Sequence, residues 1–287
     1  NVKVVNKKVS GGTSEDGVFT SVVLEDKTEM YFDRCIIATG GASYPQTGSD
    51  GDGYRFAESL GHTVKEIKPS LVPLVSHDKA CRDMMGLSLK NVEGKLEIDG
   101  KEIHSGFGEM LFTHTGVSGP LILTCSSVAG ISCEGAKLSI DLKPALDEET
   151  LDERLVRDFK SDTHKQLKSI LRGLLPASMV SVFIESAGID GSITAANVTK
   201  ETRQALIKHM KCFSMTVLGL GGYNEAVITK GGVEVKEINP STMESKICRN
   251  LYFAGEVLDI DAFTGGYNLQ IAWSTGYLAG LCASEAV

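Results

Sequence analysis

Two short apolar segments near opposite ends of the chain, CIIATGG (35–41) and LYFAGE (251–256), constrain the fold most. Each is rich in β-branched or aromatic residues and runs into glycine, which predicts a buried strand ending where a flat ligand can approach the backbone. In an open α/β sheet, ligands bind outside the carboxyl ends of strands, so both ends could line one crevice. The alternative is an ordinary tight turn after each core strand, because glycine pairs mark turns in general.

The chain between these segments predicts a nested organisation. Two prolines in KPSLVPLV (68–75) indicate a crossing into a second domain, which is β-rich with short alternating segments and resembles a small antiparallel barrel or sandwich. From about 147 to 212 apolar residues recur every three or four positions and predict four short helices. We therefore expect three parts: a discontinuous α/β domain, a β-barrel-like insert, and a helical insertion within it, at residues 1–69 with 247–287, 70–146 with 213–246, and 147–212 respectively.

Charge and cysteine content narrow the class of protein. The formal net charge of -8 argues against a nucleic-acid partner, since phosphate binding needs a surplus of Lys and Arg. No run approaches the roughly 18 apolar residues of a membrane helix. The seven cysteines are scattered without a CxxC spacing, which argues against a disulfide framework or zinc site and favours the cytoplasm. These patterns predict a small-molecule substrate, with no nucleic-acid, membrane or metal partner, and leave the oligomeric state open.

The segment after LYFAGE carries groups suited to a polar ligand. Asp259 can accept hydrogen bonds from a sugar-like or ribityl hydroxyl, whereas Asp261 is better explained as a turn residue. Gly265 and Gly266 precede an apolar helix predicted from Asn268 to about Ser284. A helix N-terminus offers unpaired N–H donors and partial positive charge, which suit a phosphate or a ring carbonyl.

Three motifs together carry a resemblance to a known family: IIATGGASYPQTGSDGDGY, LFTHTGVSGPLIL, and LYFAGEVLDIDAFTGGYNLQIAWSTGY. Over essentially the whole chain the sequence resembles NAD(P)/FAD-dependent oxidoreductases of the aminoacetone-oxidase type, which include the bile-acid Δ4,6-reductases. The resemblance implies an α/β fold with a doubly wound FAD-binding domain, interrupted by a β-barrel-like domain that carries a helical insertion.

The resemblance also implies cofactor-binding positions. The residues expected along FAD are Thr39, Gly40, Gly41, Gly255, Glu256, Asp259, Gly265, Gly266, Tyr267, Asn268, Leu269 and Gln270. Of these, Asp259 is expected at the ribityl or pyrophosphate region, and the last six are expected to present backbone donors to the isoalloxazine ring.

One part of the family pattern does not occur. No GxGxxG follows a strand and opens a helix; GLGGYNE (219–225) is nearest, with the wrong third spacing. The phosphate-binding turn is therefore expected before Asn1, and the FAD-binding domain within this chain is expected to be incomplete.

The resemblance implies a flavin-dependent oxidoreductase but leaves its reaction open. Hydride could pass from NAD(P)H through FAD to a small unsaturated, keto or steroid-like substrate, or an amine could be oxidised with oxygen as acceptor. A flavin-binding module without activity is a further alternative. Candidate proton-transfer groups are His114 and Tyr267, although a turn histidine and a packing tyrosine are equally ordinary roles. Tyr44 could also flank the ring, and the glycine-bracketed 219–238 segment could close over a substrate or be a plain hairpin.

Overall fold

The computed structural model describes residues 2–130 and 133–285, which form two compact units. The first combines Asn1–Leu71 with Gly221–Val287, and the second is Val72–Leu220. Residues 221–246 thus group by contact with the first unit. The three-part domain division with its boundaries stays a prediction.

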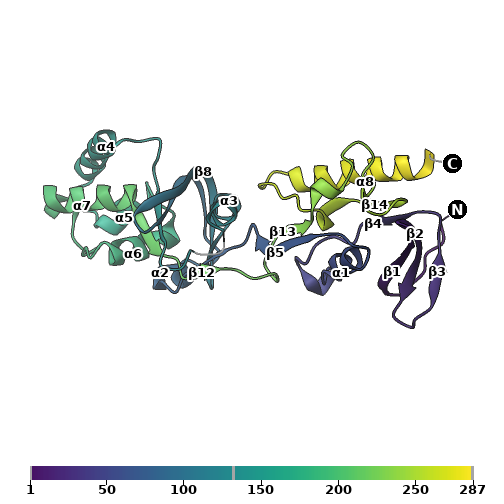
Figure 1. The fold of residues 1–287 in the computed structure, drawn as a ribbon. Coiled ribbons are helices and arrows are strands. Elements are labelled where there is room, and N and C mark those ends of the chain that lie inside the picture. Colours follow the sequence, from purple (N-terminus) through teal and green to yellow (C-terminus); the bar gives the residue numbers. More distant parts are fainter. Residues whose placement is uncertain (1, 131–132, 286–287) are drawn as a thin grey trace. The chain divides into compact units, whose positions relative to one another are not determined.

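The first unit is a mixed α/β structure with three small sheets (Figure 1). Strands β1, β2 and β3 form an antiparallel meander, β5 pairs antiparallel with β13, and β4 pairs parallel with β14. The elements are β1 (Val9–Glu15), β2 (Val18–Leu24), β3 (Glu29–Tyr31), β4 (Cys35–Ile37), the 3-10 turn η1 (Pro45–Thr47), α1 (Asp52–Ser59), β5 (Val64–Ser70), β13 (Ile228–Val233), η3 (Val235–Glu237), β14 (Leu251–Phe253), η4 (Gly255–Val257) and α8 (Tyr267–Glu285).

The two apolar segments that opened the sequence analysis are neighbours in one sheet. Cys35 lies opposite Leu251 and Ile37 opposite Phe253, with both strands running in the same direction. Their carboxyl ends therefore lie at one edge, as predicted from their glycines. Ile37 and Phe253 are almost fully buried in the core of this unit. Helix α8 lies alongside β4 and β14 (Figure 1).

The second unit contains a seven-stranded sheet with helices packed against it. Its elements are β6 (Leu74–Val75), α2 (Lys79–Asp83), β7 (Ser88–Ile98), β8 (Lys101–Thr113), β9 (Gly116–Ser118), α3 (Pro120–Ala129), β10 (Lys137–Asp141), α4 (Glu148–Ser161), α5 (Leu167–Leu171), α6 (Ala177–Ser186), η2 (Ala195–Asn197), α7 (Lys200–Lys211), β11 (Phe213–Thr216) and β12 (Gly219–Leu220). The strand order is β11-β10-β7-β8-β9-β6-β12. No closure of this sheet into a barrel is detected within the described ranges. Strands β11 and β12 follow each other in the chain, separated by Val217 and Leu218, whose N–H groups bond to Ala136 O and Val75 O.

Helix α3 packs closely against the long hairpin of β7 and β8 because three glycines leave room for it. A Cβ added at Gly94, Gly106 or Gly108 would lie 3.0 to 3.4 Å from Leu121, the second residue of α3. A Cβ at Gly116 would overlap the Leu74 carbonyl oxygen. The glycines of the LFTHTGVSGPLIL motif and its partner strands thus serve close backbone packing.

The four helices predicted between residues 147 and 212 are confirmed as α4 to α7, which gather together in this unit (Figure 1). Two of them begin at side-chain caps. Asp147 accepts a hydrogen bond from Thr150 N, and Thr199 accepts one from Thr202 N. Their apolar stripes then face the core, with Leu151, Leu155 and Phe159 buried along α4. None of the described helices combines the length and apolar composition needed to cross a bilayer.

Candidate functional site

The loop after β4 is held so tightly that only glycine fits at its centre. Thr39 is exposed, Gly40 has φ 78°, and Gly41 is buried. A Cβ at Gly41 would overlap side-chain atoms of Glu256 and Thr229. The backbone of this loop is therefore fixed by residues from the other end of the chain, and Thr39 and Gly40 remain open to a ligand.

A carboxylate and a threonine lock this loop to β13; we call this pair the Glu256–Thr229 clamp. Glu256 Oε1 accepts a 2.6 Å hydrogen bond from Thr229 N. Thr229 Oγ1 in turn accepts a 2.8 Å bond from Ala42 N and shares a 2.9 Å bond with Ser43 Oγ. Thr229 is fully buried. The clamp joins the ends of β4 and β14 to β13, and it gives Glu256 a structural task beside any contact with a cofactor.

Tyr54 places a buried hydroxyl beside the clamp. Burial, followed by the negative charge of Glu256, raises the pKa of Tyr54 above its usual value. The nearby Thr229 side chain acts in the opposite direction and partly offsets this rise in the pKa of Tyr54. The Tyr54 hydroxyl nevertheless has no hydrogen-bond partner of good geometry within the described residues. A buried hydroxyl without a partner can still form a hydrogen bond to a ligand or a water molecule.

The turn after β14 is anchored by hydrogen bonds to α8 and β13. Gly255, in η4 with φ 77°, donates its N–H to Thr275 Oγ1 on α8 at 2.9 Å. Asp259 donates its N–H to Val233 O at 2.9 Å, while its half-buried carboxylate has no hydrogen bond among the described residues. The second half of the 219–238 segment contains strand β13. Because Gly232 in this strand has no Cβ, the backbone of the turn after β14 can pack directly against it.

The start of α8 presents free donors. Gln270 N donates to Gly266 O, the first helical bond. In the part of the chain that the structure describes, the backbone N–H groups of Tyr267, Asn268 and Leu269 have no acceptor. The Asn268 side chain ties the preceding loop by bonding Ala262 N and O, both at 2.8 Å. Gly266, at φ 88°, has open space where a Cβ would be.

A cavity of about 300 Å³ lies within this unit, between β13, the turn after β14 and the first turns of α8. Most of its lining is apolar. The lining residues are Val227, Ile228, Glu256, Ile260, Asn268, Leu269, Ile271 and Ala272. Three predicted positions, Glu256, Asn268 and Leu269, therefore share one cavity.

These groups fit one end of a flavin. Free N–H donors at a helix N-terminus suit a ring carbonyl, and an unpaired Asp259 carboxylate suits a polyol hydroxyl. Tyr54 adds an unused hydroxyl nearby. The sequence holds no GxGxxG turn for the pyrophosphate, so the fit concerns the ring and ribityl portions alone.

The other proton-transfer candidate lies elsewhere in the chain. His114 is exposed in the turn between β8 and β9 of the second unit. Sequence reasoning missed Thr229, Tyr54 and Ser43, since nothing in their local pattern marks them as partners of a residue far along the chain. His62 is buried between Glu237 and Ser245.

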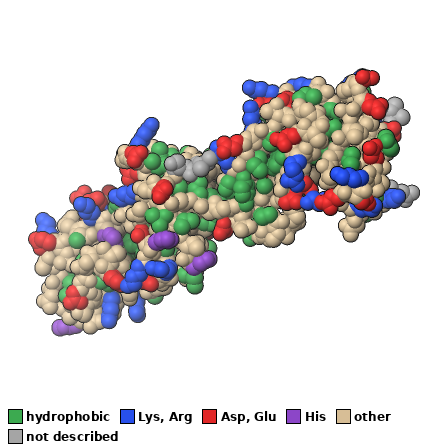
Figure 2. Space-filling model, turned by 60° about the horizontal axis from the view of Figure 1, so that its bottom comes forward, with side chains coloured by type: hydrophobic (Ala, Val, Ile, Leu, Met, Phe, Trp, Pro, Cys, Tyr) green, Lys and Arg blue, Asp and Glu red, His purple; other side chains and the backbone are tan. Residues whose placement is uncertain are grey.

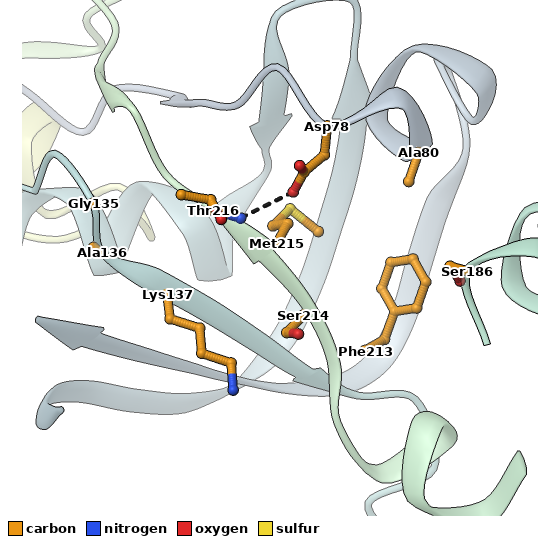
Figure 3. Close-up of a pocket in the computed structure, with 10 residues that line it drawn as sticks. All are labelled: Asp78, Ala80, Gly135, Ala136, Lys137, Ser186, Phe213, Ser214, Met215 and Thr216. Atoms are coloured by element: carbon orange, nitrogen blue, oxygen red, sulfur yellow. Dashed lines mark hydrogen bonds between the residues drawn. The ribbon is translucent and has the colours of Figure 1, made fainter. Parts of the chain in front are cut away.

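A second cavity, of about 470 Å³, lies beside strand β11 of the second unit (Figure 3). Asp78 accepts a 2.9 Å hydrogen bond from Thr216 N there, so its carboxylate covers part of the strand edge. Lys137 and Ser186 also line it. None of the predicted site residues does, and its only carboxylate is engaged with the backbone.

Comparison with known proteins places the chain in a family. Residues 1–282 match the family model described as "HI0933-like protein Rossmann domain". The ribosomal RNA dihydrouridine synthase of Haemophilus influenzae is 36% identical over 266 residues, covering 92% of this chain and 63% of that protein. The 3-dehydro-bile acid delta(4,6)-reductase of Clostridium scindens is 30% identical, covering 92% and 65%. The ribosomal RNA dihydrouridine synthase of Escherichia coli is 34% identical, covering 89% and 61%. The chain thus spans less than two thirds of each relative's length.

These relatives overturn one prediction. The acidic net charge predicted a small-molecule substrate and no nucleic-acid partner, yet two relatives are named as enzymes of ribosomal RNA. The prediction was wrong because net charge averages over the whole surface, whereas an enzyme meets its substrate through one local face. Figure 2 shows basic side chains interspersed with acidic ones on the visible face.

The family resemblance read from the three motifs is confirmed by the match and by the bile-acid reductase among the relatives. The Rossmann description agrees with the parallel β4–β14 pair and its flanking helix. The chain belongs to the HI0933-like family of FAD/NAD(P)-binding Rossmann oxidoreductases.

Proposed function

We propose that the whole protein is an FAD-dependent oxidoreductase that takes reducing equivalents from NAD(P)H, and that β4 and β14 belong to a doubly wound FAD-binding sheet. The observation that carries the proposal is the open start of α8, with three N–H groups lacking acceptors, beside a loop locked by the Glu256–Thr229 clamp. A ligand site needs such a rigid, unsatisfied set of donors. Relatives named as a synthase of dihydrouridine and as a reductase support the reaction class.

The chain's residues would bind and orient the cofactor. We assign Tyr267, Asn268 and Leu269 N–H to a ring carbonyl, where the helix dipole favours negative charge. Asp259 would accept from the polyol, and Thr39 with Gly40 would lie along it. Bound FAD supplies hydride transfer between a nicotinamide and an unsaturated carbon. The clamp keeps the strand-end loops fixed while these contacts form.

Uridine in ribosomal RNA is the substrate we propose. Forming dihydrouridine is reduction of the uracil C5=C6 bond, which is conjugated to a carbonyl. Reduction adds a hydride to one carbon and a proton to the other. We assign the proton donor to the Tyr267 hydroxyl, since it stands at the start of α8 with the other proposed contacts and is 62% exposed. His114 is the alternative donor.

A steroid-like enone is the second candidate. It contains the same conjugated double bond, and one relative is named as a bile-acid delta(4,6)-reductase. The specific observation in its favour is the apolar lining of the 300 Å³ cavity by Val227, Ile260 and Leu269. Apolar cavities of this size suit compact hydrophobic ligands.

Anaerobic flavin spectroscopy on the full-length protein tests the proposal. We expect the purified protein to be yellow, to bleach with NADH or NADPH, and to recover its absorbance on addition of uridine-containing ribosomal RNA. The Tyr267→Phe variant should still bleach, but recover at least tenfold more slowly if its hydroxyl donates the proton.

Each step has an outcome that counts against the proposal. A colourless protein that takes up no FAD would remove it. Bound flavin that NAD(P)H does not bleach would indicate a binding module, and bleaching by an amine with recovery in oxygen would indicate an amine oxidase. Recovery with a steroid enone and not with RNA would favour the second candidate.

A further inference from the structure

Tyr44 has a backbone conformation that costs free energy for a residue of its size. Its φ of 55° and ψ of 56° lie in the left-handed region, where glycine, asparagine and aspartate are the usual occupants. A bulky aromatic residue there is an outlier that invites a functional explanation. Tyr44 directly follows the clamped loop at the end of β4, in the segment ASYPQTG.

The strained conformation is held by hydrogen bonds on both sides. Tyr44 N donates to Tyr223 O at 2.9 Å, and Tyr44 O accepts from Thr47 N at 2.9 Å and from Thr47 Oγ1 at 2.7 Å. Just before it, Ser43 bonds to Thr229. The backbone therefore has one well-defined conformation before any ligand arrives.

The side chain of Tyr44 does not offset the strain within its own unit. Its side chain is 50% exposed and makes no hydrogen bond or aromatic ring contact among the described residues. Leu71 and Met243 provide a comparison, because both are large apolar residues with a left-handed backbone and both are buried, at 0% and 7% exposure. Their packing offsets their strain. The side chain of Tyr44 has no comparable packing within this unit.

We propose that Tyr44 is a substrate-binding residue whose ring stacks on the planar base that is reduced, with uracil in RNA as the ligand class. This rests on the proposed function above. Tyr44 lies on the loop that carries Thr39 to Gly41, and the Glu256–Thr229 clamp fixes that loop. Because the backbone of Tyr44 is already fixed, stacking has only the side-chain torsions left to order, and stacking on an aromatic side chain is a general way to hold a nucleobase.

The test compares Tyr44→Phe and Tyr44→Gly in the full-length holoenzyme. The probe is a short uridine-containing RNA oligonucleotide, and its dissociation constant is read from the change it causes in the oxidised flavin spectrum. Tyr44→Phe keeps the ring, so its dissociation constant should match the unaltered protein's. Tyr44→Gly should bind roughly tenfold more weakly, the loss expected for one base–aromatic stack. Tyr31→Ala, at an exposed tyrosine on β3, is the control and should change nothing.

Stability and FAD affinity separate this role from a structural one. Glycine relieves the left-handed strain, so the thermal midpoint of Tyr44→Gly should equal or exceed that of the unaltered protein. FAD affinity should be unchanged in both variants.

Three results would overturn the assignment. RNA binding by Tyr44→Gly that equals the unaltered protein's would remove the stacking contact. A lower thermal midpoint in that variant would make Tyr44 a packing residue, and weaker FAD binding would place its ring on the cofactor. If the unaltered protein binds FAD and bleaches but the oligonucleotide does not perturb its spectrum, the RNA assignment fails while the oxidoreductase proposal stands. Absence of flavin binding is the separate failure of the proposed function.

Discussion

The carboxylate of Glu256 accepts a 2.6 Å hydrogen bond from the backbone N–H of Thr229. Glu256 follows β14 and Thr229 lies in β13, so this one bond links two strands that are not paired with each other. Because Thr229 Oγ1 also holds Ala42 and Ser43, three segments of the chain meet at a single side chain. Substitutions at these residues should therefore change the stability of the fold as well as the binding of a cofactor.

Replacing Glu256 with alanine should lower the free energy of unfolding by about 1–3 kcal/mol. The substitution leaves the N–H of fully buried Thr229 without an acceptor, and an orphaned buried donor carries that cost. Chemical denaturation of the full-length protein without FAD measures the loss, because bound FAD would add its own binding free energy to the apparent stability.

Glu225→Ala is the matched control for that substitution. Glu225 also accepts a backbone N–H, from Gly222 at 2.9 Å, but the bond is exposed and water can replace it. A change within about 0.5 kcal/mol is expected. Equal losses in both variants would mean that the Glu256–Thr229 clamp contributes no more than a surface contact.

Gly116→Ala should be among the most damaging single-methyl additions in the second unit. A Cβ there would overlap the Leu74 carbonyl oxygen, and the backbone has φ 153°. Neither strand can retreat without breaking the β6–β9 pairing. We expect a loss above about 3 kcal/mol or no folded protein. Gly100→Ala, at φ 74° with open space around it, should cost only about 1 kcal/mol. Circular dichroism melts of the two variants make the comparison, and similar midpoints would contradict it.

The stability of the first unit should fall in mild acid because of His62. Its ring is 4% exposed, with Nε2 2.9 Å from Ser245 Oγ and Nδ1 3.2 Å from Glu237 Oε2. Burial lowers the pKa of His62, and Glu237 only partly opposes this. The unfolded chain thus binds a proton near its ordinary pKa of about 6.5 before the folded chain does. Stability is full above that pH and declines as pH falls from there towards the folded-state pKa.

Denaturation between pH 5 and 8 checks the His62 prediction. His62→Gln should have a shallower pH dependence in that window than the unaltered protein, whatever its absolute stability. His164→Gln, at an exposed position, should keep the original slope. A His62→Gln slope identical to the unaltered protein's would contradict the assignment.

The sequence pattern predicted those elements whose signal is local. The segments ending at Gly41 and Glu256 could be recognised as strand ends, and the three-to-four spacing from residue 147 onward predicted α4 to α7. Helix α3 was missed inside a region expected to be mostly β. Its sequence PLILTCSSVA begins with four consecutive apolar residues and continues with small residues that packing on the glycines of β7 and β8 permits, so it has no clear amphipathic period to read.

Features that depend on distant partners could not be predicted in the same way. The strand order depends on the partners of residues 213–220: β11 pairs with β10 and β12 pairs with β6, and no local pattern reports these partners. Glu256 was expected to be a cofactor-binding residue because it follows a strand end. Its hydrogen bond to Thr229 N could not be predicted, because it depends on the position of β13 in the fold. Asn268 was expected as a backbone donor, whereas its side chain also fixes the loop before α8.

Thr275→Val should loosen the turn that carries Glu256. Thr275 Oγ1 accepts the Gly255 N–H at 2.9 Å and donates to Ile271 O at 2.7 Å, so it is the only described acceptor for that N–H. Valine keeps the shape and removes the acceptor, which should cost about 1–2 kcal/mol. Because Gly255 and Glu256 lie in the same short turn, FAD should also dissociate more easily.

Two further variants isolate the hydroxyl of Thr275. Thr275→Ser keeps the oxygen and should retain both stability and FAD affinity. Thr124→Val, on α3, removes a hydroxyl that only donates to Pro120 O, so no N–H is orphaned and the change should stay within about 0.5 kcal/mol. Unfolding curves and FAD titrations of the three variants decide the matter. If Thr275→Val and Thr275→Ser behave alike, the Gly255 bond does not hold the turn, and the link from α8 to the site has to run through the packing of Ala272 against Gly255 instead.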